Sequence, residues 1–166
     1  MDGNETAYDS HTMSDQLTDP AVRRDVLSPV SLVIPCRAEY VSLCRLVVGA
    51  LGARDILDED VVADLKVIVT EACNCFLAMA SGGVPGPVSL NSGCSIRMEF
   101  DSQPDAFIIS VLYPEKRGLV SWLEDRDSMS EAGLGLTILK ALTDEMAELD
   151  DDSAGTTLRL TKHLST

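Results

Sequence analysis

The sequence predicts an α+β fold, a two-layer sandwich in which a mostly antiparallel sheet of four or five strands is covered on one face by three helices. Two observations favour this class. Apolar residues recur at helical spacing in three segments, and they alternate with polar residues or form short apolar runs in the segments between them. The chain has 166 residues with 45% hydrophobic and 4% aromatic content, so we expect one domain with a mainly aliphatic core.

The first half of the folded part predicts one strand and two helices. Residues 31–35 form a short apolar run that proline ends, which is typical of an edge strand. Apolar residues at helical spacing over 40–51 predict a helix that Gly52 closes. Asp58 is a suitable N-cap for a second helix that should run to about residue 80, with acidic residues in its first turn.

The second half predicts strands that flank a charged connection and a third helix. The apolar run at 107–113 is expected to be a central strand of the sheet, because both its faces are apolar. The expected elements are strands at 95–100 and 107–113, a connection at 114–132, a helix from 133 to about 146, a short strand at 147–149 and a last strand at 156–163.

The N-terminal segment and the net charge set the expected context of the domain. Residues 1–27 are acidic and lack apolar periodicity, so we expect a disordered tail before a domain at 28–166. The formal net charge is −14, which argues against direct nucleic-acid contact and against an anionic membrane surface. No segment approaches the roughly 20 apolar residues that span a bilayer, and the N-terminus has no signal-peptide pattern. We therefore expect a cytoplasmic protein.

The five cysteines are expected to be reduced. Their number is odd, and four of them lie in apolar contexts, which favours buried thiols over disulfides. Cys73 and Cys75 are separated by one residue, unlike the spaced pairs of a zinc site. The five are Cys36, Cys44, Cys73, Cys75 and Cys94.

Two segments contain residues suited to chemistry. In 67–76, Glu71 lies within an apolar helical run, where it is either a solvated residue at the helix margin or a general base, with an amide about one turn later that could bind a metal. In 132–138, Gly133 and Gly135 open a helix. Backbone N–H groups at a helix start can bind an anion, and glycine allows a phosphate to approach, although glycine also simply permits a tight joint.

Together and in this order, the segments resemble the GHKL ATPase superfamily. The resemblance is closer still to bacterial anti-sigma factors that are also serine-protein kinases, the RsbW type, and it covers about residues 30–164. The stretch 70–73, Thr-Glu-Ala-Cys, is similar to the start of the family's N box. The stretch 133–136, Gly-Leu-Gly-Leu, is similar to its second glycine box, and 155–157, Gly-Thr-Thr, to its closing segment.

The resemblance implies a Bergerat-type fold with ATP and Mg²⁺ held between the helices and the sheet. It also implies a protein that dimerises, sequesters a sigma factor and phosphorylates a serine on a small anti-anti-sigma protein of the STAS type. By this resemblance Glu71 corresponds to the family's catalytic base. Asn74 is the residue nearest to the position of the metal-binding amide, and the resemblance implies it as the metal ligand. The implied nucleotide-binding residues are Gly118, Gly133, Gly135 and Thr156.

The sequence departs from the family pattern at two boxes. The N box is E-A-x-x-N, but Cys75 stands where the asparagine belongs and Asn74 precedes it, about 100° away around a helix. A thiol is a poor ligand for Mg²⁺. In the first glycine box, D-x-G-x-G, the adenine-binding aspartate is Pro114 and only Gly118 remains. These departures predict weak or lost kinase activity.

Three functions therefore remain open. The favoured one is an anti-sigma-like regulator that binds a sigma factor, an anti-anti-sigma protein or both, with weak or lost ATP-dependent serine kinase activity. The second is a fully active anti-sigma kinase that binds Mg-ATP. The third is an unrelated small α+β interaction domain.

Overall fold

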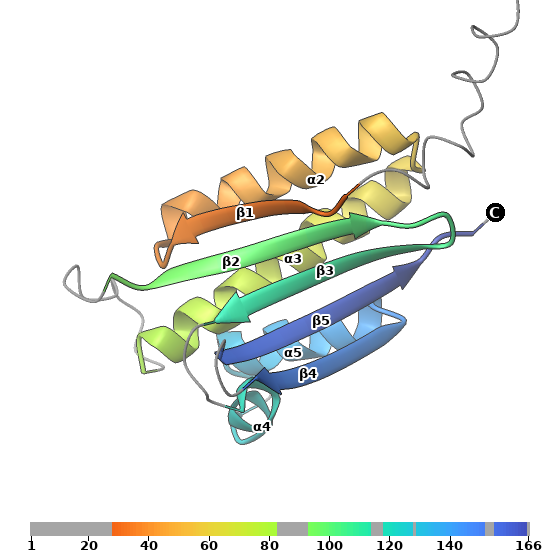
Figure 1. Ribbon diagram of the computed structural model, residues 1–166. Helices are drawn as coiled ribbons and strands as arrows, with labels where there is room; N and C mark the ends of the chain where they lie inside the picture. Colours follow the sequence, from red (N-terminus) through yellow and green to blue (C-terminus); the bar gives the residue numbers. More distant parts are fainter. Residues whose placement is uncertain (1–27, 83–92, 114–117, 128, 152–154, 166) are drawn as a thin grey trace, which may run out of the picture.

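The computed structural model describes residues 28–82, 93–113, 118–127, 129–151 and 155–165. Within them, one sheet has the strand order β1-β2-β3-β5-β4, and every neighbouring pair is antiparallel. The long helices lie together on one face of this sheet (Figure 1). The predicted two-layer α+β sandwich is confirmed, whereas the predicted tail at 1–27 lies outside the described residues.

The elements follow the predicted order with two short additions, η1 and a helix, α4, inside the predicted connection at 114–132. The strands are β1 (Val30–Pro35), β2 (Ser95–Ser102), β3 (Ala106–Tyr113), β4 (Glu145–Asp151) and β5 (Gly155–His163). The helices are the short 3₁₀ turn η1 (Ala38–Tyr40), α2 (Val41–Asp55), α3 (Glu59–Ala80), α4 (Leu119–Glu124) and α5 (Glu131–Leu142).

The core lies between the sheet and the helices. Alternate residues of each strand point toward the helices, as a pleated strand requires. Strand β3 lies between β2 and β5, so the prediction of a central strand is confirmed. The largest fully buried side chains come from both layers: Phe76, Phe100, Phe107, Ile34, Leu65, Ile68, Met79, Ile96, Met98, Ile109, Leu119 and Leu123.

The boundary between α2 and α3 differs from the prediction in one respect. Asp58 caps α3 as expected, because its Oδ1 accepts a hydrogen bond of 3.0 Å from the Asp60 N–H. Gly52, however, does not end α2; the helix continues to Asp55, and Ile56 forms the C-cap in a left-handed conformation. A Cβ on Gly52 would lie 2.5 Å from Cγ2 of Val62, so this glycine allows α2 and α3 to pack closely.

Helix α5 was predicted from 133 to about 146. It begins two residues earlier, at Glu131, and ends about four residues earlier, at Leu142. Ser130 caps it, because Ser130 Oγ accepts a hydrogen bond from the Gly133 N–H at 3.2 Å. At the other end, the Asp144 N–H donates to the Thr161 carbonyl, and Met146 pairs with Leu160 in the sheet. Strand pairing with β5 therefore overrides the helical spacing of the apolar residues and extends β4 to Glu145–Asp151.

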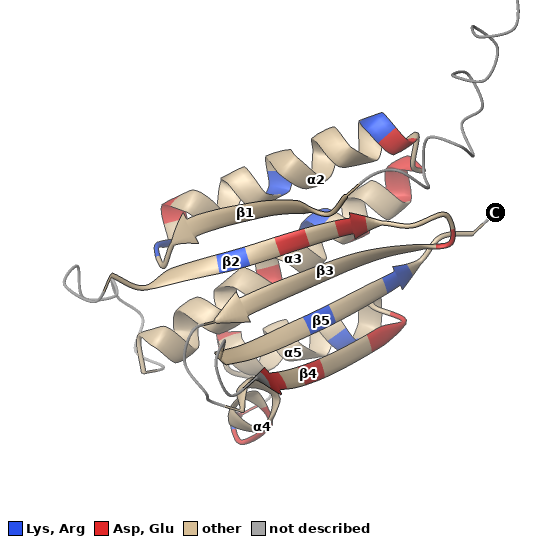
Figure 2. Cartoon of the chain, viewed as in Figure 1, with Lys and Arg blue, Asp and Glu red and all other residues tan. Residues whose placement is uncertain are grey.

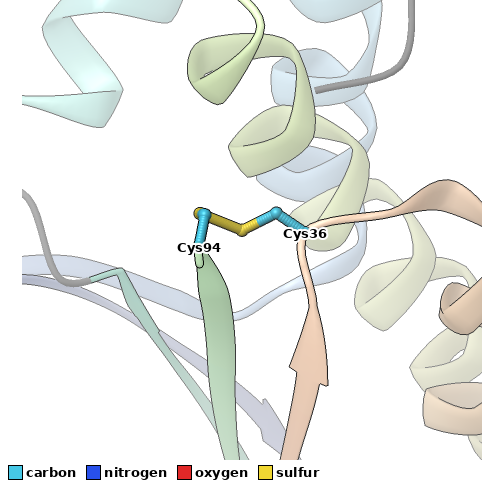
Figure 3. The surroundings of a disulfide bond; sticks show 2 residues. All are labelled: Cys36 and Cys94. Atoms are coloured by element: carbon cyan, nitrogen blue, oxygen red, sulfur yellow. A yellow bond between two sulfur atoms is a disulfide. The ribbon is translucent and has the colours of Figure 1, made fainter. Parts of the chain in front are cut away.

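The expectation of reduced cysteines is wrong for one pair. Cys36 and Cys94 form a disulfide that joins the end of β1 to the start of β2 (Figure 3). The pairing of Pro35 with Ser95 across the two strands brings the neighbouring cysteines together, with Cα atoms 5.5 Å apart. The odd number of cysteines and their apolar neighbours contain no information about how β1 and β2 pair. The sequence analysis therefore could not identify the Cys36–Cys94 disulfide. Three cysteines are free and buried: Cys44, Cys73 and Cys75.

No helix in the described part of the chain combines the length and the apolar character needed to cross a bilayer.

The close contact of α2 with α3 gives a stability prediction. We expect Gly52→Ala to lower the free energy of unfolding by about 1–3 kcal/mol, because the added methyl group forces Val62 or the helices to move. Gly49→Ala is the matched control on the same helix, since its Cβ meets only the flexible end of Lys66, at 3.3 Å. Urea unfolding measures both variants, and equal stabilities would contradict the account.

Candidate functional site

The candidate site begins on α3, where the predicted N box lies. Glu71 and Cys75 are four residues apart, which places them on the same side of a helix. Glu71 is half-buried and Cys75 is buried. The apolar run around them fixes this helix on the core, so the Glu71 carboxylate is held at the junction between the core and solvent.

Helix α5 packs on this side of α3, and Gly135 is the residue at the contact. A Cβ on Gly135 would lie 3.1 Å from Oε2 of Glu71 and 3.2 Å from Sγ of Cys75. Outside α5, no other described residue has an atom within 4 Å of that position. The structure thus brings two N-box positions, Glu71 and Cys75, against Gly135 of the second glycine box, and the glycine leaves room for the other two side chains.

The electrostatics of this contact favour uncharged forms. Burial raises the pKa of the Glu71 carboxyl, and the negative charge of Glu131 raises it further. Burial, with a smaller contribution from the charge of Glu71, raises the pKa of the Cys75 thiol to about 12. At neutral pH the residue in the asparagine position of the N box is therefore a neutral, buried thiol.

These side chains do not fit the Mg²⁺ ion that the resemblance implies. Mg²⁺ prefers oxygen ligands in octahedral geometry, and a protonated thiol supplies a soft sulfur instead. Asn74 is half-buried on α3, but it is not among the side chains that meet Gly135. Its role as a metal ligand stays a prediction, and the geometry at Gly135 gives it no support.

The start of α5 is the predicted phosphate site. Gly133 and Gly135 are both buried and lie within the helix, not before it. The Gly133 N–H donates to Ser130 Oγ, and Glu131 places a carboxylate in the first turn. A side chain of the protein therefore already accepts one of the backbone donors that a phosphate would use, and the nearby carboxylate disfavours an added anion.

Thr156, at the start of β5, is linked to the Cys75 region of α3 by two successive contacts. The ring of Phe76, next to Cys75 on α3, lies 5.6 Å from that of Tyr113 at the end of β3. Tyr113 pairs with Thr156 across β3 and β5. Thr156 is fully buried, and its hydroxyl donates to Oδ1 of Asp150 at 2.9 Å. The predicted phosphate-binding hydroxyl thus already donates to a carboxylate.

Gly118 caps α4, a six-residue helix within the predicted connection. Glu148 of β4 accepts hydrogen bonds from the Leu119 and Val120 N–H groups at 2.5 and 2.9 Å. Sequence analysis missed Glu148, because its partners lie 28 and 29 residues earlier. The available signal was that Gly118 has no side chain to cap the helix, which leaves the first N–H groups to water or to an acceptor from another element.

The structure therefore brings Glu71 and Gly135 into contact and leaves the other predicted residues around them. Gly133 and Thr156 have protein partners. Gly118 directly precedes α4, which contacts α5 through the ion pair of Glu124 with Lys140 at 2.9 Å.

A model of the family described as histidine kinase-like ATPase domain matches residues 34–162. The chain belongs to the histidine kinase-like ATPase family. The matched range contains the described contact of Glu71 and Cys75 with Gly135. Membership overturns the third alternative, an unrelated α+β domain.

Relatives of this ATPase domain with similar sequences include serine-protein kinases named RsbW. The protein from Bacillus licheniformis is 30% identical over 142 residues, covering 82% of this chain and 86% of the relative. The protein from Bacillus subtilis strain 168 is 27% identical over 140 residues, with the same coverage. The protein from Halalkalibacterium halodurans is 30% identical over 139 residues, covering 81% and 83%. The resemblance to the RsbW-type branch is confirmed.

The raised pKa of Glu71 predicts a pH-dependent effect on stability. Because the folded state raises this pKa above its ordinary value of 4.5, ionisation of Glu71 destabilises the fold as pH rises through the folded-state pKa. We expect Glu71→Gln to raise Tm at pH 7, and the gain to shrink as pH falls below 4.5. Thermal unfolding across pH 3–8 measures the effect on full-length protein.

Glu131→Gln supplies the second arm of this test. Removal of its negative charge should lower the pKa of Glu71, which can be followed by NMR of the Glu71 side-chain carboxyl. A gain in Tm from Glu71→Gln that is the same at pH 3 and pH 7 would contradict the assigned cause.

Proposed function

We propose that this protein is an anti-sigma-like regulator that acts by protein–protein contact and has weak or lost ATP-dependent serine kinase activity. Its partners are a sigma factor, an anti-anti-sigma protein of the STAS type, or both. The relatives named serine-protein kinase RsbW and the family resemblance support this class of function. A homodimer is part of the proposal through the same resemblance.

The observation that carries the proposal is the Glu71–Cys75–Gly135 contact. Phosphoryl transfer depends on neutralisation of the developing phosphate charge, usually by a metal ion. Here the side chain beside Glu71 is a buried neutral thiol, and the adjacent carboxylates add negative charge. The site therefore retains the candidate base, and the residue one turn after it, Cys75, offers a thiol in place of an oxygen ligand.

The active-kinase alternative has one specific observation in its favour. Glu71 keeps the position of the family's base, and burial raises its pKa toward the range in which a carboxylate accepts protons effectively. In this alternative Glu71 would take the proton of the attacking serine hydroxyl. Nucleotide binding by the chain's own groups would involve the backbone at Gly133 and Gly135, after the Gly133 N–H is released from Ser130.

A variant with an asparagine restored at position 75 distinguishes weak or lost kinase activity from the active kinase. We expect Cys75→Asn to raise the affinity for ATP in the presence of Mg²⁺ at least about tenfold over the natural chain, because the amide supplies an oxygen in the missing position. Isothermal titration with and without Mg²⁺ measures this change. Phosphorylation of purified STAS-type protein from the same organism, followed by mass spectrometry, measures the kinase activity.

Cys75→Ala is the matched control, since it removes the thiol without adding a ligand. We expect no Mg²⁺-dependent gain in this variant. Efficient phosphorylation by the natural chain, abolished by Glu71→Ala, would overturn the proposal of weak or lost activity and establish the active kinase.

A further inference from the structure

The C-cap of α2 combines two unusual features. Ile56 has φ 55° and ψ 46°, the left-handed region, and it is the single non-glycine residue with positive φ among the described residues. A β-branched residue is rarely found there, because its side chain crowds the backbone, whereas glycine adopts it freely. The same side chain is 83% exposed, so burial of its apolar surface within the chain does not offset this strain.

The end of α2 explains why residue 56 is left-handed, but it does not explain why that residue is an isoleucine. The Ile56 and Leu57 N–H groups both donate to the Gly52 carbonyl, as in a helix that ends through a left-handed residue. Glycine or asparagine at position 56 would make the same hydrogen bonds with less strain. Single exposed apolar residues are ordinary on protein surfaces, but one held in an unfavourable backbone conformation requires another explanation.

The surroundings of Ile56 are open and acidic. A shallow, open part of the surface lies beside it, lined by Ile56, Leu57, Asp58, Glu59, Asp60 and Ser165. Between residues 54 and 60 the charged residues are one arginine, Arg54, and four carboxylates, and Arg54 is bound to Asp55 through two hydrogen bonds of 2.7 and 2.8 Å. Figure 2 shows the resulting acidic start of α3 beside the end of α2.

We infer that Ile56, with the acidic rim formed by Asp58, Glu59 and Asp60, is a docking surface for the sigma factor, and this inference rests on the proposed function. An exposed apolar side chain fits a partner pocket, and a rim of carboxylates fits a partner surface rich in Lys and Arg. Proteins that contact DNA phosphates carry such a basic surface.

Charge disfavours a second copy of this chain and nucleic acid as occupants. A second copy of this chain would place one acidic rim against another, which costs free energy. Nucleic acid would meet carboxylates in place of the basic groups that bind phosphate. The docking surface also lies at the end of α3 opposite to its C-terminal half, which contains Glu71 and Cys75 (Figure 1). Partner capture through Ile56 therefore does not require an active nucleotide site.

The test uses Ile56→Gly in the full-length chain, because this change separates binding from folding. We expect Tm to stay equal or rise, since glycine relieves the left-handed strain, while the affinity for the sigma factor falls at least tenfold. The probes are the purified sigma factors of the same organism, titrated one at a time by isothermal calorimetry. Ile56→Leu keeps an apolar side chain, so its affinity should stay within about threefold of the natural chain.

Two further variants complete the experiment. Leu149→Thr removes an apolar side chain of β4 that is 51% exposed, and it should leave the affinity unchanged within twofold. The double variant Glu59→Gln and Asp60→Asn should weaken binding at low salt and reduce the dependence of affinity on salt. Both results are expected if the docking surface is specific and partly electrostatic.

The outcomes distinguish this inference from the proposed function. If the natural chain binds a sigma factor and Ile56→Gly binds it equally well, the docking surface is overturned and the proposed function stands. If affinity falls only in variants whose Tm also falls, Ile56 is structural and the inference is overturned. If the natural chain binds none of the sigma factors, the proposed function fails and the inference fails with it.

Discussion

The candidate site depends on the close approach of α3 and α5 at Gly135. Because this residue has no side chain, the Glu71 carboxylate and the Cys75 thiol can lie directly over the backbone of α5. The same approach partly buries Glu71 beside Glu131, which raises its pKa, and fully buries Cys75, which keeps its thiol protonated. One packing constraint therefore sets the geometry, the charge and the metal preference of the site together.

Around this contact, two of the groups that the family resemblance assigns to a nucleotide have protein partners, and so do the two N–H groups next to a third, Gly118. Ser130 accepts from the Gly133 N–H, Asp150 accepts from Thr156, and Glu148 accepts from the two N–H groups that follow Gly118. Such contacts satisfy polar groups that would otherwise be buried without partners. They stabilise the fold without a ligand, and a nucleotide would have to replace some of them.

Much of the fold could be predicted from the sequence, because helical spacing and strand alternation are local properties. The helix after Asp58 and the central strand at 107–113 are examples. The residues whose positions depend on distant partners could not be predicted. Glu148 stabilises α4 across 28 residues of sequence, Cys36 meets Cys94 only through the β1–β2 register, and Ile56 caps a helix that Gly52, four residues earlier, was expected to end.

The measurement that tests the central claim most directly is the location of a paramagnetic divalent ion in the presence of ATP. Mn²⁺ can replace Mg²⁺ and selectively broadens NMR signals of nearby amides in the ¹⁵N-labelled full-length chain. A site without an oxygen ligand at Cys75 predicts no selective broadening of the amides of residues 71–75. Strong broadening confined to these amides, reversed by excess Mg²⁺, would show that the α3–α5 contact holds the metal and would contradict the account.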